Sequence, residues 1–394
     1  ALTRADEPDD FTVVWFSDTQ PQSWNELDYV RDDVVSELIG VEAAFGVTTG
    51  DIMYDDHALI PRQNSIISQI GIPWYNIPGN HEINFLAPND ELSMETFKRE
   101  FGPPYYSWDY GQVHFIALED AIYDGTSAGA EDAHPRGKGA YEGGVSEVQL
   151  EWLANDLAQT PKDKLVVLAM HIPFKSNLYP DRRGRNMGNR DEVFELVRDF
   201  PHRFAVAGHM HTTYHLYFGE EAGFSDDDPL HQHVMATVSG SWWSGPYDEH
   251  GIPVSYQEDG TPNGYYFMDV RGTDVSMRFK AAGRPAAEQM RVVLDTSFHT
   301  GSQTSLNNYR TGEILRPPIH VDQAYSTRVI VNLYDGGPRS RVEFEIDGFE
   351  PVQMDRVLEK DPFMVEHHLR NPGQAKSWVE TKPSEHLWAA PLPP

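Results

Sequence analysis

Cysteine is absent from this chain of 394 residues. Its absence excludes disulfide bonds, thiolate metal ligands and cysteine nucleophiles. A metal bound by this protein must therefore be held by histidine, aspartate, glutamate, asparagine or glutamine side chains. Long apolar runs are absent as well, since none approaches the roughly 20 residues that a membrane-spanning helix needs. We expect no membrane span.

Basic residues are scarce in this sequence. The chain has 31 lysines and arginines against 61 aspartates and glutamates, which leaves a formal net charge of −30. Proteins that bind nucleic acid or anionic membranes through charge need a basic surface, so we expect neither as a partner. We interpret the acidic excess as a solvated surface. The length suggests two domains, each large enough to bury a core of its own.

The first two thirds of the chain alternate strand-like apolar runs with helix-like segments, which indicates an α/β sandwich. Ser146 and Gln149 have the spacing of a capping box at the start of one helix. The Gly- and Asp-rich stretch between Ala121 and Gly144 has no periodicity and predicts a long surface loop. The predicted helices cover residues 26–45, 61–70, 146–159 and 190–199.

The pattern of the sequence changes from about Gly283. Short β-like runs separated by Asp-Gly turn signals follow, at residues 329–333, 341–346 and 355–359. We therefore predict a first domain over residues 1–285 and a small, mostly β second domain over residues 286–394. The linker between them is expected at residues 283–300.

Five apolar runs in the predicted first domain each end in residues that can bind a metal. Taken singly, an aspartate after a strand is more often a turn or a helix cap. Polar residues at the end of a core strand do not contribute to its packing, however. Five strands that each end in such residues therefore favour a metal centre on one edge of a sheet. The runs are FTVVWF before Asp18 and Gln20, FGVTT before Asp51, PWYNIP before Asn80 and His81, KLVVLAM before His171, and RFAVA before His209 and His211.

The candidate ligands suit two adjacent divalent cations. Asp18 and Gln20 are two residues apart, so on a strand both side chains would point to the same face. Asp51 follows a glycine that allows close approach of the backbone, as a carboxylate shared by two cations requires. The other candidates supply an amide oxygen or imidazole nitrogens, and they are Asn80, His171, His209 and His211.

In this order the motifs resemble the calcineurin-like metallophosphoesterase superfamily, whose pattern is D-x-H, G-D, G-N-H-[DE], a lone H and G-H-x-H. The resemblance spans residues 13–211. Residues 240–245 and 259–265 resemble the bacterial branch that carries an additional C-terminal β domain. The resemblance implies a metallophosphoesterase-type αββα sandwich followed by a small, mostly β C-terminal domain. Related proteins usually continue past Trp388, so we expect that this domain is truncated here.

The resemblance also implies a role for each motif residue. A hydroxide bridging two metals would attack phosphorus, so that no covalent intermediate is needed. His81 and Asp51 are expected to be catalytic, with His81 protonating the leaving group or stabilising developing charge. Asp55 or Glu82 would orient His81 or a metal ligand, and Asn80 would also contact the substrate. The implied ligands are Asp18, Gln20, Asp51 and His211 for one metal, and Asp51, Asn80, His171 and His209 for the other.

The first motif departs from the family pattern, because Gln20 stands where most members have histidine. An amide oxygen is neutral and harder than an imidazole nitrogen. The site should therefore bind its metal less tightly and prefer Mn²⁺ or Fe over Zn²⁺. We expect two divalent or trivalent metal ions as cofactors, with Mn, Fe and Zn as the candidate elements.

Residues 181–190 carry four arginines in an otherwise acidic chain and begin about ten residues after His171. Arginine binds phosphate through two parallel hydrogen bonds. We therefore predict that Arg182, Arg183 and Arg185 bind the substrate. The alternative is a solvated loop whose arginines pair with local acids.

These features predict a metal-dependent phosphoester hydrolase that acts on a small phosphorylated substrate. We favour a phosphomonoesterase, because the extra arginines match a phosphate that carries two charges. The enzyme alternative is a phosphodiesterase acting on a nucleotide or a lipid head group. A hypothesis of another class is a targeting or binding protein whose C-terminal module dominates its role. Since the bacterial branch is often exported, we expect a periplasmic or extracellular location.

Overall fold

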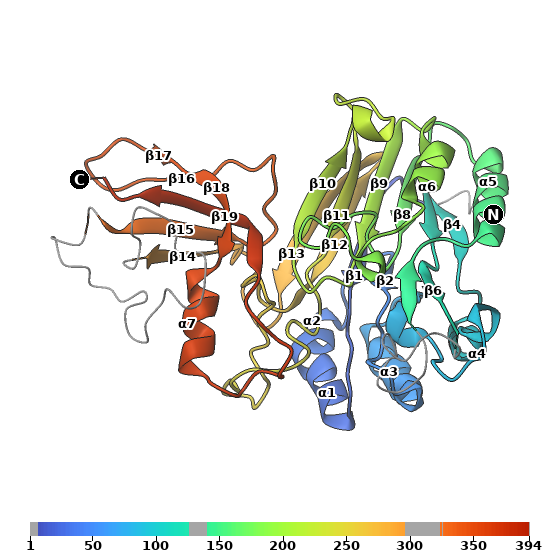
Figure 1. Ribbon diagram of the computed structural model, residues 1–394, viewed down its shortest axis with the longest axis horizontal. Helices are drawn as coiled ribbons and strands as arrows, with labels where there is room; N and C mark the ends of the chain where they lie inside the picture. The colour runs from blue at the N-terminus through green and yellow to red at the C-terminus, as the bar shows by residue number, and fades with distance from the viewer. Residues whose placement is uncertain (1–6, 126–139, 296–323, 325, 394) are drawn as a thin grey trace. The chain divides into compact units, whose positions relative to one another are not determined.

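The computed structural model describes residues 7–125, 140–295, 324 and 326–393 (Figure 1). The chain forms two compact units. The first unit falls within residues 1–210, 216–239 and 265–278, and the second within residues 211–215, 240–264 and 279–394. The units are thus interleaved in sequence, whereas the single boundary between residues 285 and 286 stays a prediction. None of the described helices is long and apolar enough to cross a membrane.

Two sheets form the centre of the first unit (Figure 1). The first sheet has the order β13 (Asp274–Ala281), β12 (Gly264–Arg271), β1 (Asp10–Phe16), β2 (Phe45–Thr49) and β3 (Trp74–Ile77). The second has the order β10 (Tyr214–Phe218), β11 (Leu230–Val234), β9 (His202–Ala207), β8 (Leu165–Ala169), β5 (Val113–Ala117) and β4 (Tyr106–Tyr110).

The two sheets pack face to face through aromatic side chains. The ring of Phe45 in β2 lies 5.4 Å from that of Phe115 in β5, in an edge-to-face arrangement. Every residue of β2, β5 and β8 is buried, which requires a covering layer on both faces of each sheet. Helices supply the outer layers (Figure 1). The predicted αββα sandwich is therefore confirmed.

Strand direction brings the predicted motifs to one edge of each sheet. β1, β2 and β3 run parallel to one another, as do β5, β8, β9 and β11. Parallel strands present their carboxyl ends on the same side. The residues that follow β1, β2, β3, β8 and β9 include the predicted metal ligands.

The predicted helices are present with adjusted ends. The first of them is divided into α1 (Trp24–Tyr29), a π-helical stretch (Val30–Val35) and α2 (Ser36–Leu38), and it stops before β2 begins. Ser146 caps its helix as predicted, since its Oγ accepts a hydrogen bond from the backbone N–H of Gln149 at 3.3 Å. The others are α3 (Ile60–Ile67), α5 (Glu147–Gln159) and α6 (Arg190–Val197), and α4 (Glu95–Phe101) was not predicted.

The stretch between Ala121 and Gly144, predicted to be a loop, contains a small ribbon. β6 (Ala121–Tyr123) pairs antiparallel with β7 (Tyr141–Gly143). The prediction was wrong for these residues because strands of three residues are too short to show an alternating pattern. Residues 126–139 lie outside the described residues.

The second unit is built on an antiparallel sheet, in agreement with the predicted mostly β C-terminal region. Trp388 and Val331 belong to its apolar core. The strand order is β14 (Met290–Asp295), β15 (Arg328–Leu333), β19 (Pro383–Pro391) and β18 (Asp355–Lys360), and α7 (Pro362–Arg370) follows β18 in the chain. The strand predicted at 341–346 is shorter, as β16 (Glu343–Phe344) paired with β17 (Val352–Gln353).

The predicted linker at residues 283–300 was wrong in its central part. β14 lies within this range and pairs along its whole length with β15. Its sequence, MRVVLD, has three apolar residues in a row between two charged ones, so apolar and polar residues do not alternate as they do in a half-buried strand. Residues 296–300 lie outside the described part of the chain.

Candidate metal centre

Five of the seven predicted ligands have a left-handed backbone. Eight non-glycine residues have positive φ in the part of the chain that the structure describes. This conformation costs about 1–3 kcal/mol for a residue with a side chain, and it persists where the surroundings impose it, often at functional sites. The five ligands are Asp18 (46°), Gln20 (37°), Asp51 (50°), His209 (71°) and His211 (50°).

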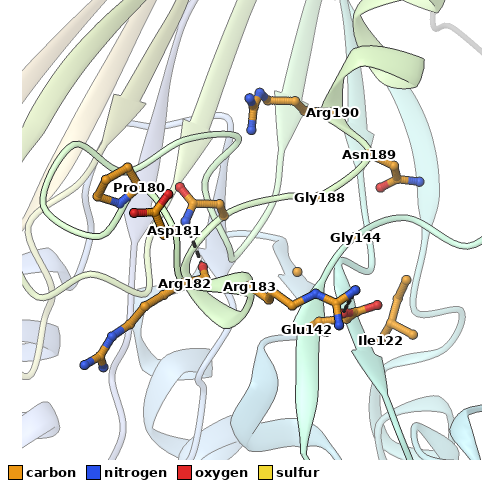
Figure 2. A pocket seen from close by; sticks show the side chains of 12 residues that line it. Ile122, Glu142, Gly144, Pro180, Asp181, Arg182, Arg183, Gly188, Asn189 and Arg190 are labelled. Carbon is orange, nitrogen blue, oxygen red and sulfur yellow. Dashed lines mark hydrogen bonds and ion pairs between the residues drawn. The ribbon is translucent and has the colours of Figure 1, made fainter.

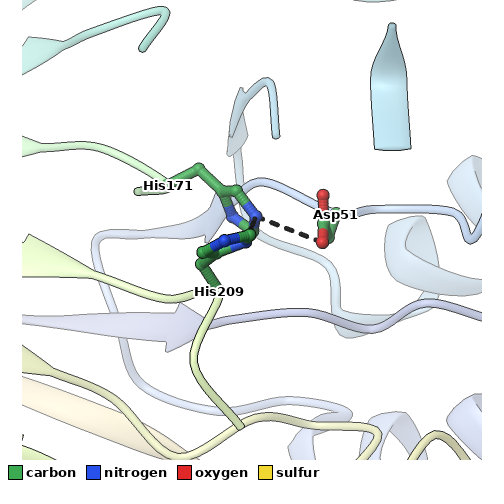
Figure 3. Close-up of side chains that lie close together, drawn as sticks. All are labelled: Asp51, His171 and His209. Atoms are coloured by element: carbon green, nitrogen blue, oxygen red, sulfur yellow. Dashed lines mark hydrogen bonds and ion pairs between the residues drawn. The ribbon is translucent and has the colours of Figure 1, made fainter. Parts of the chain in front are cut away.

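Four predicted ligands converge on one point in the first unit. Nε2 of His171 lies 3.1 Å from Oδ2 of Asp51, 3.2 Å from Oδ1 of Asn80 and 3.1 Å from Nδ1 of His209. Figure 3 shows three of these side chains, with the carboxylate of Asp51 directed at the two rings. All four residues are buried. They are the four that were expected to hold one metal.

Backbone carbonyls set which ring nitrogens face this point. Nδ1 of His171 donates its hydrogen to the carbonyl of Thr49 at 2.8 Å, and Nε2 of His209 donates to the carbonyl of Gly184 at 2.8 Å. The nitrogens that remain, Nε2 of His171 and Nδ1 of His209, therefore carry the lone pairs that a metal would use. Two nitrogen and two oxygen donors directed at one point fit a divalent cation such as Mn²⁺, Fe²⁺ or Zn²⁺.

The charged side chains of the cluster shift one another's pKa values. Burial acts to lower the pKa of His171, but the adjacent carboxylate of Asp51 raises it to about 10. Burial acts to raise the pKa of Asp51, but His171 and His81 lower it below its ordinary range. Burial, reinforced by the guanidinium of Arg185, lowers the pKa of His209 and keeps that ring neutral. A cation at this point would compete with a proton for the lone pair on Nε2 of His171.

The glycines of the motifs are needed for close approach. A Cβ atom at Gly79 would lie 2.3 Å from Oδ1 of Asp51, and one at Gly208 would lie 2.5 Å from Oδ2 of Asp18. Neither position has room for a side chain without moving a predicted ligand.

Gln20 bonds to Asp51 through the nitrogen of its amide. Its Nε2 donates to Oδ2 of Asp51 at 2.5 Å, because only the nitrogen of the amide can donate to a carboxylate. Its Oε1 is buried and has no hydrogen-bond partner. A buried polar atom without a partner costs about 1–3 kcal/mol, and a cation would satisfy it. Asp18 lies near the same motifs, since its Oδ2 accepts a hydrogen bond from the backbone N–H of His209 at 3.0 Å.

His211 belongs to the second unit and is held there by residues of that unit. Its Nδ1 donates to the carbonyl of Gly240 at 2.7 Å, which leaves Nε2 as the nitrogen available to a metal. Its ring stacks on that of Trp242 at 3.7 Å between centroids. Trp242 is itself in the left-handed region, with φ of 53°.

His81 lies beside the cluster and pairs with Asp55. Its Nδ1 lies 2.7 Å from Oδ1 of Asp55, and its Nε2 lies 3.8 Å from Oδ2 of Asp51. Burial acts to lower the pKa of His81, but these two carboxylates raise it above its ordinary value. The ring also stacks on Tyr54 at 4.6 Å. Asp51 and Asp55 therefore favour the protonated form of the His81 ring.

Glu82 connects the two loops that carry Asn80 and Asp51. Its carboxylate accepts hydrogen bonds from the backbone N–H groups of Gly79 at 2.7 Å and Met53 at 3.1 Å. It thus ties the loop of Asn80 to the loop that follows Asp51. The ring of His81 bonds instead to the carboxylate of Asp55.

Two residues near the cluster were missed in the sequence. Asp120 follows β5, and its Oδ2 accepts a hydrogen bond from the backbone N–H of Ile172, next to His171, at 2.7 Å. Burial raises the pKa of Asp120 to about 7. The ring of Tyr141 lies 6.4 Å from that of His209. Asp120 follows an apolar run as the other motif residues do, and this signal could have found it.

The arginine segment borders the cluster and a pocket of about 430 Å³. Figure 2 shows Arg182, Arg183 and Arg190 around that pocket. Arg183 pairs with Glu142 at 2.8 Å, which offsets part of its charge. Nη1 of Arg185 donates to the carbonyl of His209 at 3.1 Å. Arg185, one of the predicted substrate-binding arginines, therefore directly contacts a predicted metal ligand.

The chain belongs to the calcineurin-like phosphoesterase family, which it matches over residues 11–213. Residues 232–394 match the C-terminal domain of calcineurin-like phosphoesterases. The predicted family is therefore confirmed, including the additional C-terminal domain. The protein is a hydrolase that acts on phosphoesters.

Individual relatives share a modest part of the sequence. The chain is 25% identical over 236 residues to a probable glycerophosphodiester phosphodiesterase, GpdQ, of Arcobacter nitrofigilis, covering 56% of this chain and 79% of that protein. A dimetal phosphatase from Danio rerio has a TM-score of 0.46 and 16% identity over 69% of this chain and 96% of its own. The structure of PhoD has a TM-score of 0.44 and 13% identity, and the match covers 70% of this chain and 69% of PhoD.

Proposed function

We propose that the protein is a phosphomonoesterase that uses two metal ions held by the predicted ligands. The observation that supports this proposal is the convergence of His171, His209, Asp51 and Asn80 on one point. The unpartnered Oε1 of Gln20, whose amide bonds to Asp51, supports a second ion beside the first. When bound, such ions would stabilise charge on the phosphoryl oxygens and lower the pKa of a coordinated water.

The chain's own residues would then bind the substrate and move its protons. Asp51 and Asn80 would place the ions, and the amide of Asn80 would also contact the phosphoryl group. His81, whose pKa is raised by Asp51 and Asp55, would donate its proton to the leaving oxygen as the ester bond breaks. Arg185, anchored on the backbone of His209, would bind a phosphoryl oxygen beside the cluster.

Preference for a monoester is supported by the positive charge of the arginine segment. Arg182, Arg183 and Arg190 line the same pocket, against the acidic side chains of Glu142 and Asp181. A terminal phosphate with two charges gains more from such a surface than a diester with one charge does. We propose a small phosphorylated molecule as the substrate.

A second candidate is a phosphodiesterase acting on a nucleotide or a lipid head group. The observation that favours it is the relationship to the probable glycerophosphodiester phosphodiesterase. The pairing of Arg183 with Glu142 also lowers the charge available to a second anionic oxygen.

Hydrolysis of paired chromogenic substrates would separate these candidates. The purified protein, stripped of metal and then loaded with Mn²⁺, would be assayed on p-nitrophenyl phosphate and on bis(p-nitrophenyl) phosphate. We expect a higher kcat/KM for the monoester and no turnover before metal is added. A higher value for the diester would select the second candidate. Lack of turnover on both, with metal bound, would contradict both.

The residue Gln20 suggests which metal its site prefers. We propose that the site containing Gln20 prefers Mn²⁺ or Fe over Zn²⁺, because its glutamine supplies an oxygen where an imidazole would supply a nitrogen. A periplasmic or extracellular location is proposed from the family branch alone. Fractionation of the native cells with an antibody against the protein would test it.

A further inference from the structure

The backbone that carries His211 is tied to a buried carboxylate of the same unit. Thr213, two residues after His211, donates its backbone N–H to Oδ2 of Asp259 at 2.6 Å. The position of His211 is thus set on one side by Gly240 and Trp242, and on the other by Asp259 through Thr213.

The carboxylate of Asp259 is in turn bonded to a residue of β19. Its side chain and that of His386, in β19, are both fully buried. Nε2 of His386 donates to Oδ2 of Asp259 at 3.0 Å, and Oδ1 accepts the backbone N–H of Thr261 at 2.9 Å. A buried carboxylate is stable only when donors surround it. Removal of His386 would therefore disturb the group that fixes Thr213.

The loop around Asp259 is held by other strands of the same sheet. Asn332, in β15, donates through Nδ2 to the carbonyl of Asp259 at 3.1 Å. Arg291, in β14, donates through Nη1 to the carbonyl of Gly260 at 2.9 Å. Gly260 has φ of 92°, and a Cβ atom there would lie 2.4 Å from Oδ2 of Asp361. Three strands of the C-terminal sheet thus impose the conformation of this loop.

We propose that Asp259 and His386 are positioning residues for the metal ligand His211. The C-terminal sheet would then hold this one ligand in place. The proposal rests on the proposed function in one respect, because it takes His211 as a metal ligand. It concerns only residues of the second unit, and it assigns to a strand more than 170 residues away in sequence a role at the catalytic motif.

Binding of Mn²⁺ to the metal-free, full-length protein tests this inference. Titration calorimetry would give the number of sites and their affinities for the wild type, His386→Leu and His386→Gln. We expect two sites in the wild type. In His386→Leu one site should weaken by about tenfold to a hundredfold while the other is unchanged, as is found when the partner of a metal ligand is lost. Glutamine keeps a donor near the place of Nε2 and should restore the weakened site.

Asp295→Asn is the matched control. Asp295 is also buried in the same sheet, where its Oδ2 accepts a hydrogen bond from Nε of Arg328 at 3.0 Å. This variant should lower the unfolding temperature of the metal-free protein without changing either affinity for Mn²⁺. If His386→Leu does not fold, Asp259→Asn takes its place, since it keeps the volume, removes the charge and should weaken the same single site.

The outcomes distinguish this inference from the proposed function. Two unchanged sites in the folded His386→Leu variant would overturn the inference while leaving the metal-dependent function in place. An equal loss of affinity in Asp295→Asn would also overturn it, because the effect would then follow from stability alone. A wild type that binds no Mn²⁺ would instead contradict the proposed function, and the inference with it.

Discussion

Nε2 of His171 and Nδ1 of His209 face each other at 3.1 Å. The other nitrogen of each ring donates a hydrogen bond to a backbone carbonyl. If both rings were neutral, the two nitrogens that face each other would therefore both carry lone pairs. Such an arrangement is favourable only when a positive charge lies between the donors. The carboxylate of Asp51 raises the pKa of His171 to about 10, which favours a proton at this point, and a metal cation would supply the same charge when bound.

Replacement of Asp51 should remove metal from both sites. Its Oδ2 contacts His171 and the amide of Gln20, so its charge serves both groups of ligands. We expect Asp51→Asn to abolish hydrolysis and to copurify with little metal, measured by mass spectrometry of the elements. Asp163→Asn, at an exposed position, should retain both metals. Two metals retained in Asp51→Asn would show that this carboxylate is not shared.

Replacement of His81 should slow the reaction but leave the metals in place. If His81 is the general acid, His81→Ala should lower kcat by roughly 10² to 10⁴ while metal content stays at the level of the wild type. Loss of metal from this variant would make His81 a ligand instead.

The pH profile should report on the partner of His81. Asp55 helps to raise the pKa of His81, so the protonated ring persists to higher pH in the wild type. In Asp55→Asn this pKa falls, and the decline of kcat on the alkaline side should move to lower pH. An unchanged alkaline limb would mean that a group other than His81 supplies the proton.

Gln20→His should change the metal preference of its site. An imidazole nitrogen replaces the amide oxygen that has no partner in this structure, and nitrogen favours Zn²⁺ more than oxygen does. Competition between Zn²⁺ and Mn²⁺ for the metal-free protein should shift toward Zn²⁺. An unchanged ratio of affinities would indicate that Gln20 does not touch the metal.

The arginine segment should act on substrate binding. Replacement of Arg182, Arg183 and Arg185 together by alanine should raise KM and leave metal content intact. One charge-assisted contact contributes about 1.5–3 kcal/mol, which corresponds to roughly a tenfold to hundredfold loss in kcat/KM.

A triple variant with the same change in charge is the control for the arginine segment. Its three arginines are exposed and lie elsewhere in the chain, at Arg99, Arg198 and Arg356. Their replacement by alanine should leave KM near that of the wild type. Equal kinetics in the two triple variants would remove the main support for a doubly charged monoester.

Most of the site could be predicted from the residues that directly follow the strands. Asp51, Asn80, His171 and His209 each follow an apolar run, and parallel strands necessarily bring such residues to one edge. Asp55 could be placed near His81 only as an alternative to Glu82, because spacing along the chain does not show which carboxylate faces the ring. In the structure the ring of His81 bonds to Asp55.

Contacts between distant segments could not be predicted from local patterns. β14 lacks clear alternation, and β6 and β7 are only three residues long, so pairing with a partner strand defines them as strands. The role proposed for His386 depends on a bond to Asp259, 127 residues earlier. No local sequence pattern near either residue predicts that bond.

Anomalous diffraction from crystals of the Mn²⁺-loaded protein would test most directly whether the four convergent side chains hold a cation. Data collected on both sides of the manganese absorption edge would locate the ions. We predict a peak within about 2.0–2.3 Å of Nε2 of His171, Nδ1 of His209 and Oδ2 of Asp51, with Oδ1 of Asn80 completing the site. An enzyme that hydrolyses phosphoesters in the same Mn²⁺ solution, but whose crystals show no peak at this point, would contradict the assignment.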